Sequence, residues 1–291
     1  SGHGCVPVDP RGLKFPIFKA MSEFGAFLEK NKVAWNQRTE IHVDSDFYDV
    51  AGFKAGRSSL KGVELSLLGD LSSKAVLHLQ CHFGQDTLSL ARMGADTTGV
   101  DFSENAIEYA RVLSREIGVD ARFVLSDVLA LNLGETFDVV FASYGVIGWI
   151  PDLQKWVDTA ALHLAAGGEL VLVEFHPLLW LLDDPTRADY FFSTQPDIET
   201  ENGTYTDGGA DTAITTCWWN HPLSALFRCL KKAGLELLSF EEFDHSPWGL
   251  AGMVEREKGQ FVLASRADQR LPHCYAIKAR KTAAPPSPVS G

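Results

Sequence analysis

Two aspartates that each end a short apolar run have the clearest chemical meaning in this chain. Asp101 lies 17 residues beyond Gly84, and Asp127 ends the next apolar run. A carboxylate at the end of a buried strand can accept hydrogen bonds from both hydroxyls of a ribose, and a second carboxylate from the exocyclic amine of an adenine. Phe102 and Val128 follow them and could sandwich the base. The structural alternatives are a helix N-terminal charge for Asp101 and a turn cap for Asp127.

Further polar residues follow the other predicted strands. Gln80 comes after the first strand, Ser143 and Tyr144 after the fourth, and Glu174 and His176 after the fifth. Open α/β sheets bind ligands at the carboxyl ends of their strands, so these side chains are expected at one edge.

Three side chains are candidates for acid–base chemistry. They are His176, Tyr144 and His221, the last of which ends an aromatic-rich segment. A histidine base is chemically sensible because its unperturbed pKa is near 6.5. The alternative for His176 is a hydrogen bond to backbone at the exit of a strand.

The segments that must position these residues alternate between the hydrophobic pattern of strands and that of helices. Short apolar runs typical of buried strands cover 74–80, 96–100, 122–125, 137–142 and 169–175. Amphipathic helical stretches lie between them, and one begins at Ser103, a good N-cap. This order predicts an α/β fold with a doubly wound, mostly parallel sheet. Two later strands are expected to form an antiparallel pair at its edge.

The flanking segments divide the chain further. We expect a flexible N-terminus over 1–16, a helical cap over 17–71 and the main domain over 72–281. Within the main domain, residues 176–221 lose the strand–helix alternation and are interpreted as a lid insertion. The Pro-rich segment 282–291 is expected to be a disordered tail.

The central sequence resembles the class I S-adenosylmethionine-dependent methyltransferases. The motifs are VLHLQCHFGQDTLSLARMGADTTGVDFSENAIEYAR, then SDV, FDVVFASYGVIGWIPD and AAGGELVLVEFHP. The resemblance covers roughly residues 60–180, with a plausible ending at 222–281. It implies a seven-stranded sheet whose last strand is antiparallel, S-adenosyl-L-methionine as cofactor and S-adenosyl-L-homocysteine as product.

The first loop departs from the family pattern D-x-G-x-G-x-G. His78, Gln80, His82 and Gly84 stand at those positions, so only the last glycine remains. Without the other glycines a pyrophosphate cannot approach the backbone closely, which argues against NAD or FAD. The donor of a methyltransferase carries no phosphate, and Gln80 is expected to bind its amino or carboxylate group.

The resemblance also implies that the N-terminal cap helps to close the site. Arg57 is a candidate for the donor carboxylate and Tyr48 for a further donor contact, the alternative being ordinary packing and surface roles. The expected cofactor-binding residues are Tyr48, Arg57, Gln80, Gly84, Gln85, Asp101, Phe102, Ser103, Asp127, Val128 and Ser143. The expected substrate-binding residues are Trp35, Phe53, Trp149, Glu174, Trp218 and Trp219.

Composition narrows the partners. The 291 residues carry 26 Lys and Arg against 38 Asp and Glu, a net charge of -12, without a basic cluster. This disfavours nucleic acid as a partner. No apolar run approaches the about 20 residues of a membrane span. Five scattered cysteines and the lack of a metal-ligand cluster favour a reducing, cytoplasmic setting, although a removed targeting segment stays open because the chain starts at Ser1.

The predicted function is methyl transfer to a small-molecule acceptor through nitrogen, oxygen or sulfur, by in-line displacement. Positioning supplies most of the acceleration, and a base is needed only where the acceptor must lose a proton. The aromatic-rich insertion fits a lid over a small acceptor, or else a homodimer contact. The alternatives are a protein or tRNA methyltransferase, a non-catalytic donor-binding regulator and, more distantly, a nicotinamide dehydrogenase.

Overall fold

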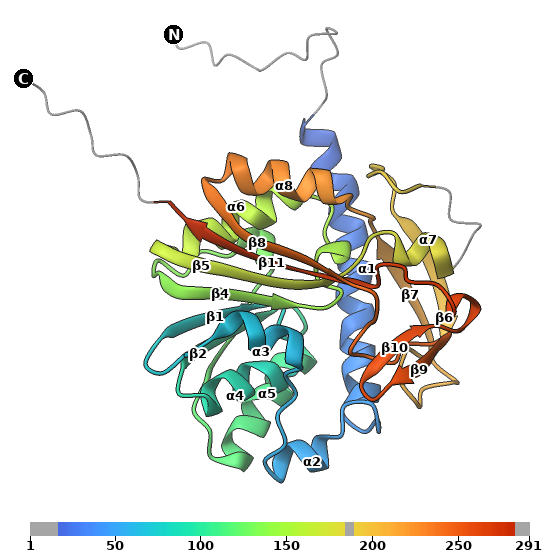
Figure 1. The fold of residues 1–291 in the computed structure, drawn as a ribbon, viewed down its shortest axis with the longest axis horizontal. Helices are drawn as coiled ribbons and strands as arrows, with labels where there is room; N and C mark the ends of the chain where they lie inside the picture. The colour runs from blue at the N-terminus through green and yellow to red at the C-terminus, as the bar shows by residue number, and fades with distance from the viewer. Residues whose placement is uncertain (1–16, 184–188, 283–291) are drawn as a thin grey trace, which may run out of the picture.

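The computed structural model describes residues 17–183 and 189–282, which surround a seven-stranded sheet (Figure 1). Neighbouring strands are parallel except for β11, which runs antiparallel to both β5 and β8. The predicted doubly wound sheet is therefore confirmed, with β8 at the edge and the last strand one place inside it. The strands, in order across the sheet, are β3 (Arg122–Leu125), β2 (Asp96–Asp101), β1 (Ala75–Leu79), β4 (Phe137–Ser143), β5 (Leu164–Phe175), β11 (Cys274–Lys281) and β8 (Leu235–Phe243).

Helices cover both faces of this sheet because its central strands are apolar on both sides. Leu68 and Leu90 pack with Val76 on one face of the sheet. Trp156 and Leu226 belong to the hydrophobic core on the other face. Figure 1 shows the two helical layers. The first layer holds α3 (Gly62–Leu68), α4 (Gln85–Arg92) and α5 (Glu104–Ile117), and the second α6 (Leu153–His163) and α8 (Leu223–Lys232).

The turn from β2 into α5 has the predicted capping. The Ser103 hydroxyl accepts a hydrogen bond from Ala106 N, and Gly118 ends the helix with a positive φ of 63°. This turn places Asp101 at the carboxyl end of β2, with its side chain beside the loop that follows β1.

A long N-terminal helix, α1 (Ile17–His42), runs past the carboxyl ends of the parallel strands (Figure 1). Asn31 fixes it to the insertion, because its side chain both donates to Cys217 O and accepts from Cys217 N at 2.8 Å. Asn36 ties the same helix to Ser103, whose hydroxyl donates to Asn36 Oδ1 at 2.7 Å. The short helix α2 (Val50–Lys54) follows.

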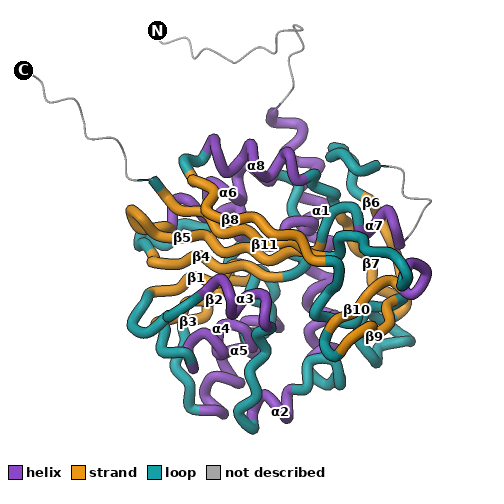
Figure 2. Tube along the Cα trace, viewed as in Figure 1, coloured by secondary structure: helices purple, strands orange, loops and turns teal. Residues whose placement is uncertain are grey.

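Two hairpins are drawn to the right of this helix in Figure 2. In the expected insertion, α7 (Leu179–Asp183) precedes β6 (Asp197–Asn202), which pairs with β7 (Ala213–Trp218). The second hairpin, β9 (Met253–Glu257) with β10 (Gln260–Leu263), lies between β8 and β11, where the sequence analysis predicted no strand. Its strands are short and turn at Gly259, with φ 74°, so they give little periodic signal. The 3-10 turns are η1 (Val128–Ala130), η2 (Ile147–Trp149) and η3 (Ala264–Arg266).

The segments predicted to be flexible, 1–16 and all of 282–291 except Thr282, lie outside the described residues. Across 17–183 and 189–282, no helix combines the length and the apolar character needed to cross a membrane.

Candidate active site

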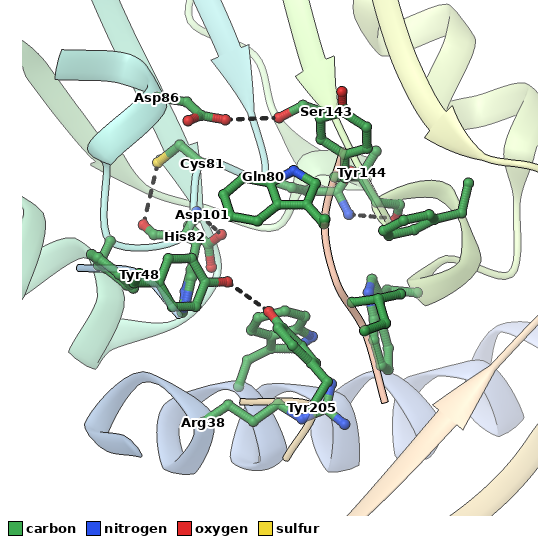
Figure 3. Close-up of a pocket in the computed structure, with 18 of the residues that line it drawn as sticks. Arg38, Tyr48, Gln80, Cys81, His82, Asp86, Asp101, Ser143, Tyr144 and Tyr205 are labelled. Atoms are coloured by element: carbon green, nitrogen blue, oxygen red, sulfur yellow. Dashed lines mark hydrogen bonds between the residues drawn. The ribbon is translucent and has the colours of Figure 1, made fainter. Parts of the chain in front are cut away.

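A cavity of about 370 Å³ lies at the carboxyl ends of the parallel strands (Figure 3). Loops after β1, β2, β4 and β5 form one side, and α1 with residues of both hairpin regions forms the other. Many of the sequence-predicted residues meet here, namely Tyr48, Gln80, Gly84, Gln85, Asp101, Phe102, Ser143, Tyr144, Trp35, Trp149 and Trp218. The cavity is also lined by residues that the sequence analysis did not select, including Arg38, His82, Asp86, Phe175, Trp180, Glu199, Glu201, Tyr205 and Trp248.

The loop after β1 turns through three positive φ angles, of 54° at Gln80, 51° at His82 and 85° at Gly84. A Cβ at residue 84 would lie 2.7 Å from the Phe123 ring, so this position requires glycine. The Gln80 side chain donates to Val146 O and accepts from the indole of Trp156, both at 2.8 Å. Gln80 therefore ties the first loop to the loop after β4 and to α6, while it lines the cavity.

Asp101 is buried, and its two carboxylate oxygens accept the backbone N–H groups of His82 and Ser103 at 2.9 Å. Burial raises the pKa of Asp101 to about 6, against the lowering effect of these hydrogen bonds. A carboxylate in this position can accept further hydrogen bonds from a ligand, because each oxygen has two lone pairs. Phe102 lines the cavity next to it.

A second cluster of polar side chains lies around the start of α4. Asp86 accepts from the hydroxyls of Ser59 at 2.6 Å and Ser143 at 3.0 Å. The Tyr144 hydroxyl donates to the buried Glu64 at 2.7 Å, and burial raises the pKa of both groups. The signal for Asp86 was available in the sequence, since it lies in the first helical turn, two residues after Gly84.

Glu174 shapes the loop that follows β4. Its carboxylate accepts the N–H groups of Gly145, Val146, Ile147 and Phe175. The side chain is buried and outside the cavity lining, in contrast to the expected substrate contact. Glu174 thus positions the turn that holds Tyr144, whose φ is 46°.

Two histidines stand hydrogen-bonded beside the cavity. Nδ1 of His42, at the end of α1, lies 2.9 Å from Nε2 of His82, and Nε2 of His42 lies 2.7 Å from the Thr204 hydroxyl. Burial, more than any other influence, lowers the pKa of His82 to about 3 and lowers the pKa of His42 strongly. Arg38 lowers the pKa of both further. Trp35, Arg38 and His42 are spaced i, i+3, i+7, a helical pattern that could have marked this face.

Aromatic side chains form a closed ring of contacts around the cavity. Ring centroids of Trp35 and Trp149 lie 5.3 Å apart, those of Trp149 and Trp218 4.8 Å, and those of Trp218 and Trp180 5.2 Å. Such walls favour planar or apolar ligands. The ring continues through Phe175, Tyr144, Trp248, Phe47, Tyr205 and His42, and returns to Trp35.

Arg38 is the buried cation of this wall, with 4% of its surface exposed. Its guanidinium carbon lies 5.4 Å from the Trp35 ring centroid and 5.2 Å from that of Trp149. Its terminal nitrogen pairs with Glu201 at 3.1 Å. Nε of Arg38 is buried and has no hydrogen-bond partner among the described residues.

The two other predicted catalytic residues are turned away from the cavity. His176 Nε2 lies 3.0 Å from Glu242 Oε1, and Nδ1 accepts from Leu178 N at 3.1 Å. His221 donates from Nε2 to Ile150 O at 2.9 Å and stacks on Phe192. Both rings are held by these partners, and neither histidine belongs to the cavity lining.

Among the other predicted residues outside the cavity lining, Ser103 caps α5, and Asp127 accepts from Leu129 N at 2.8 Å as the cap of η1. Val128 lies in the core. Arg57 is exposed and pairs with Asp49 at 2.8 Å.

The remaining two predicted aromatics are also buried elsewhere. Phe53 packs under Arg92, whose guanidinium carbon lies 4.4 Å from its ring centroid. Trp219 packs edge-on against Phe27. In the described part of the chain, no group of three or more His, Cys, Asp or Glu residues is placed to hold a metal ion.

Comparison with known proteins gives the same fold. Residues 76–168 match a family model described as a methyltransferase domain. A crystal structure of an S-adenosylmethionine-dependent methyltransferase from Clostridium acetobutylicum aligns with a TM-score of 0.54 and 15% identity, over 83% of this chain and 94% of that one. At this identity, the similarity concerns the fold.

Curated relatives match over the central part of the chain. The ubiquinone biosynthesis O-methyltransferase of Nitrosomonas europaea is 31% identical over 104 residues, which are 35% of this chain and 44% of the relative. The demethylmenaquinone methyltransferase of Thermus thermophilus is 32% identical over 120 residues, which are 40% of this chain and 53% of the relative. The chain thus spans about half the length of these relatives.

Proposed function

We propose that this chain, whose residues 76–168 belong to the methyltransferase-domain family, is an S-adenosylmethionine-dependent methyltransferase acting on a small acceptor that carries an aromatic ring. One observation carries the proposal. A single cavity joins a buried carboxylate and an aromatic side chain at the end of β2 to a closed aromatic wall. The first part suits a nucleoside, and the second suits the acceptor.

At the donor end, Asp101 accepts hydrogen bonds from the ribose hydroxyls, and Phe102 packs against the adenine. The donor is cationic at its sulfonium and ammonium groups. Asp86 lines the same cavity and supplies negative charge near the first turn of α4. Carboxylates at both places stabilise the cation more than they would in water, because the site is partly desolvated.

At the acceptor end, the tryptophan wall orients a ring against the methyl group. Methyl transfer needs the acceptor atom, the methyl carbon and the leaving sulfur in line, so orientation supplies much of the acceleration. The acceptor gains the methyl group, the sulfonium becomes the thioether of S-adenosylhomocysteine, and any acceptor proton is released. The relatives named for ubiquinone and demethylmenaquinone support a ring-bearing acceptor.

A small acceptor is favoured over a protein or tRNA by charge and shape. The chain carries a net charge of -12, and α1 and both hairpin regions contribute walls to the cavity. A polyanion would be repelled by such a chain. A donor-binding regulator would share the donor end of the site and is separated from an enzyme only by turnover.

Calorimetry of the whole chain with S-adenosylhomocysteine tests the donor site. We expect micromolar binding that Asp101→Asn weakens at least about tenfold, as expected for loss of a charged hydrogen-bond acceptor. Asp96→Asn is the matched control, because Asp96 is exposed at the opposite end of the same strand. Equal binding by all three proteins would refute the donor site.

Turnover is tested separately with methyl-labelled donor and a panel of phenols, aromatic amines and aromatic thiols. Labelled product from at least one class is expected. Donor binding without any turnover across the panel would favour the regulator.

A further inference from the structure

The hydrogen bonds of His82 and His42 form a chain with one unpartnered end. His82 lines the cavity, His42 follows it, and Thr204 ends the series between β6 and β7. Both ring nitrogens of His42 are used. His82 uses Nε2 towards His42, while its Nδ1 is buried and has no hydrogen-bond partner among the described residues.

A buried nitrogen without a partner, on a residue that lines the cavity, points to a ligand that completes it. Buried polar atoms in folded proteins nearly always have a hydrogen-bond partner, so an exception needs an explanation. Two more residues that line the cavity have such an atom. Arg38 Nε and Trp218 Nε1 are buried and have no hydrogen-bond partner among the described residues. Three residues of the cavity wall, Arg38, His82 and Trp218, therefore each carry a buried polar atom whose hydrogen-bonding capacity is unfilled.

The hydrogen-bonded series of His82, His42 and Thr204 is suited to transferring a proton rather than to holding one. With both rings neutral, His82 Nε2–H donates to His42 Nδ1, and His42 Nε2–H donates to the Thr204 hydroxyl oxygen. This arrangement leaves a lone pair on His82 Nδ1. Thr204 is partly exposed, so the series leads from the cavity to solvent.

Arg38 decides the kind of acceptor. Its buried guanidinium lies close enough to depress the pKa of both imidazoles. One terminal nitrogen of Arg38 is paired with Glu201, while the unpartnered Nε can donate to a developing oxyanion on the acceptor. The aromatic wall favours a hydroxyl carried on a ring.

From this geometry, we propose that His82, His42 and Thr204 relay the proton of a phenolic acceptor, so that the enzyme is an O-methyltransferase. The proposal rests on the proposed function and names its acceptor atom. The phenol oxygen bonds to the methyl carbon as the carbon–sulfur bond breaks. The phenol proton passes to His82 Nδ1, the His82 Nε2 proton to His42, the His42 Nε2 proton to Thr204, and the Thr204 hydroxyl proton to solvent. Neither ring gains a net charge.

The first test uses 4-nitrophenol, because its ionised form is coloured. In the complex of the whole chain with S-adenosylhomocysteine, bound 4-nitrophenol should ionise at lower pH than in water. His82→Gln and Arg38→Gln should each remove most of that shift. A wild-type complex that binds S-adenosylhomocysteine but leaves 4-nitrophenol unbound or un-ionised would overturn the relay, whereas a protein that fails to bind S-adenosylhomocysteine contradicts the proposed function itself.

The second test uses methyl transfer from labelled donor to 4-nitrophenol, with 4-nitrothiophenol and 4-nitrobenzylamine for comparison. The phenol should be the preferred acceptor, and His82→Gln should lower kcat at least about 100-fold, the usual size of a general-base contribution. The donor Kd should stay within about twofold. Faster turnover of the thiol or the amine contradicts the assignment to oxygen, and a weakened donor Kd with unchanged kcat would move His82 to the donor site.

Thr204 separates a relay from a structural role. Thr204→Val should lower kcat and flatten the solvent deuterium isotope effect, while Thr204→Ser restores both. Thr200→Val is the matched control, since Thr200 is exposed on β6 and pairs with Thr215 at 2.8 Å. An isotope effect that is the same in wild type and Thr204→Val would exclude proton transfer through this hydroxyl.

Discussion

The pH dependence of donor binding should follow the ionisation of Asp101. Burial raises the pKa of this carboxyl from 3.8 to about 6, and the ribose hydroxyls need the ionised form as their acceptor. At pH 5, one unit below that pKa, only about a tenth of the sites are ionised, so S-adenosylhomocysteine should bind about tenfold more weakly than at pH 7 to 8. Binding should be nearly constant above pH 7.

The contribution of Asp101 to the stability of the free protein should change with pH in the opposite direction. A carboxyl whose pKa is higher in the folded state favours folding while it is protonated, and this contribution is lost as pH rises from about 4 to about 6. The difference between 3.8 and about 6 corresponds to about 3 kcal/mol. His82 and His78 act in the other sense, because their pKa values of about 3 and about 4 in the folded protein lie below the unfolded value of 6.5, so their contribution to stability is lost as pH falls below about 6.5. Comparison of the wild type with Asp101→Asn at each pH isolates the Asp101 contribution.

Calorimetry with S-adenosylhomocysteine at pH 5, 6, 7 and 8 measures the binding, and urea unfolding at the same pH values measures the stability. Asp101→Asn should bind weakly at every pH and lose the pH dependence, with Asp96→Asn as a control that keeps it. A wild-type Kd that is constant from pH 5 to 7 would refute the reasoning, as would an Asp101→Asn protein with the wild-type pH profile.

Three further substitutions test the geometry around the cavity. Glu174→Ala leaves four N–H groups without their acceptor and should lower the free energy of unfolding by at least about 3 kcal/mol, whereas Glu169→Ala on the same strand should cost about 1 kcal/mol in urea unfolding. Gly84→Ala forces a Cβ to within 2.7 Å of an aromatic ring at φ 85°, so calorimetry should detect no donor binding. Gly148→Ala would place a Cβ 2.0 Å from the Trp218 ring, and should reduce acceptor turnover while the donor Kd stays unchanged.

The sheet and the position of Asp101 were predictable because both depend on local sequence. Apolar runs of strand length alternate with amphipathic helices, and the carboxyl ends of parallel strands must meet at one edge. The rule does not say which way a side chain turns after the strand. The backbone N of His176 donates to His273 O at 2.9 Å, so the chain is still paired with the segment that leads into β11 at this point. The His176 ring lies against Glu242 of β8.

The histidine pair and the aromatic ring could not be read from local sequence. His42 and Thr204 are separated by 162 positions and meet only because α1 packs against β7. At Asp127, by contrast, the side chain makes a hydrogen bond within its own turn. Its carboxylate caps η1 through Leu129 N, so the residue is used by its own turn.

The altered first loop has a physical explanation in its contacts. Gln80 and His82 adopt φ of 54° and 51°, where a side chain costs about 1 kcal/mol or more relative to glycine. Gln80 offsets this strain with two hydrogen bonds at 2.8 Å, to Trp156 and Val146, and His82 with its contact to His42. Glycine at either position would relax the backbone but would cut the donor loop from the surrounding helices. The Gln80 and His82 side chains therefore couple the loop after β1 to α6 on one side and to α1 on the other.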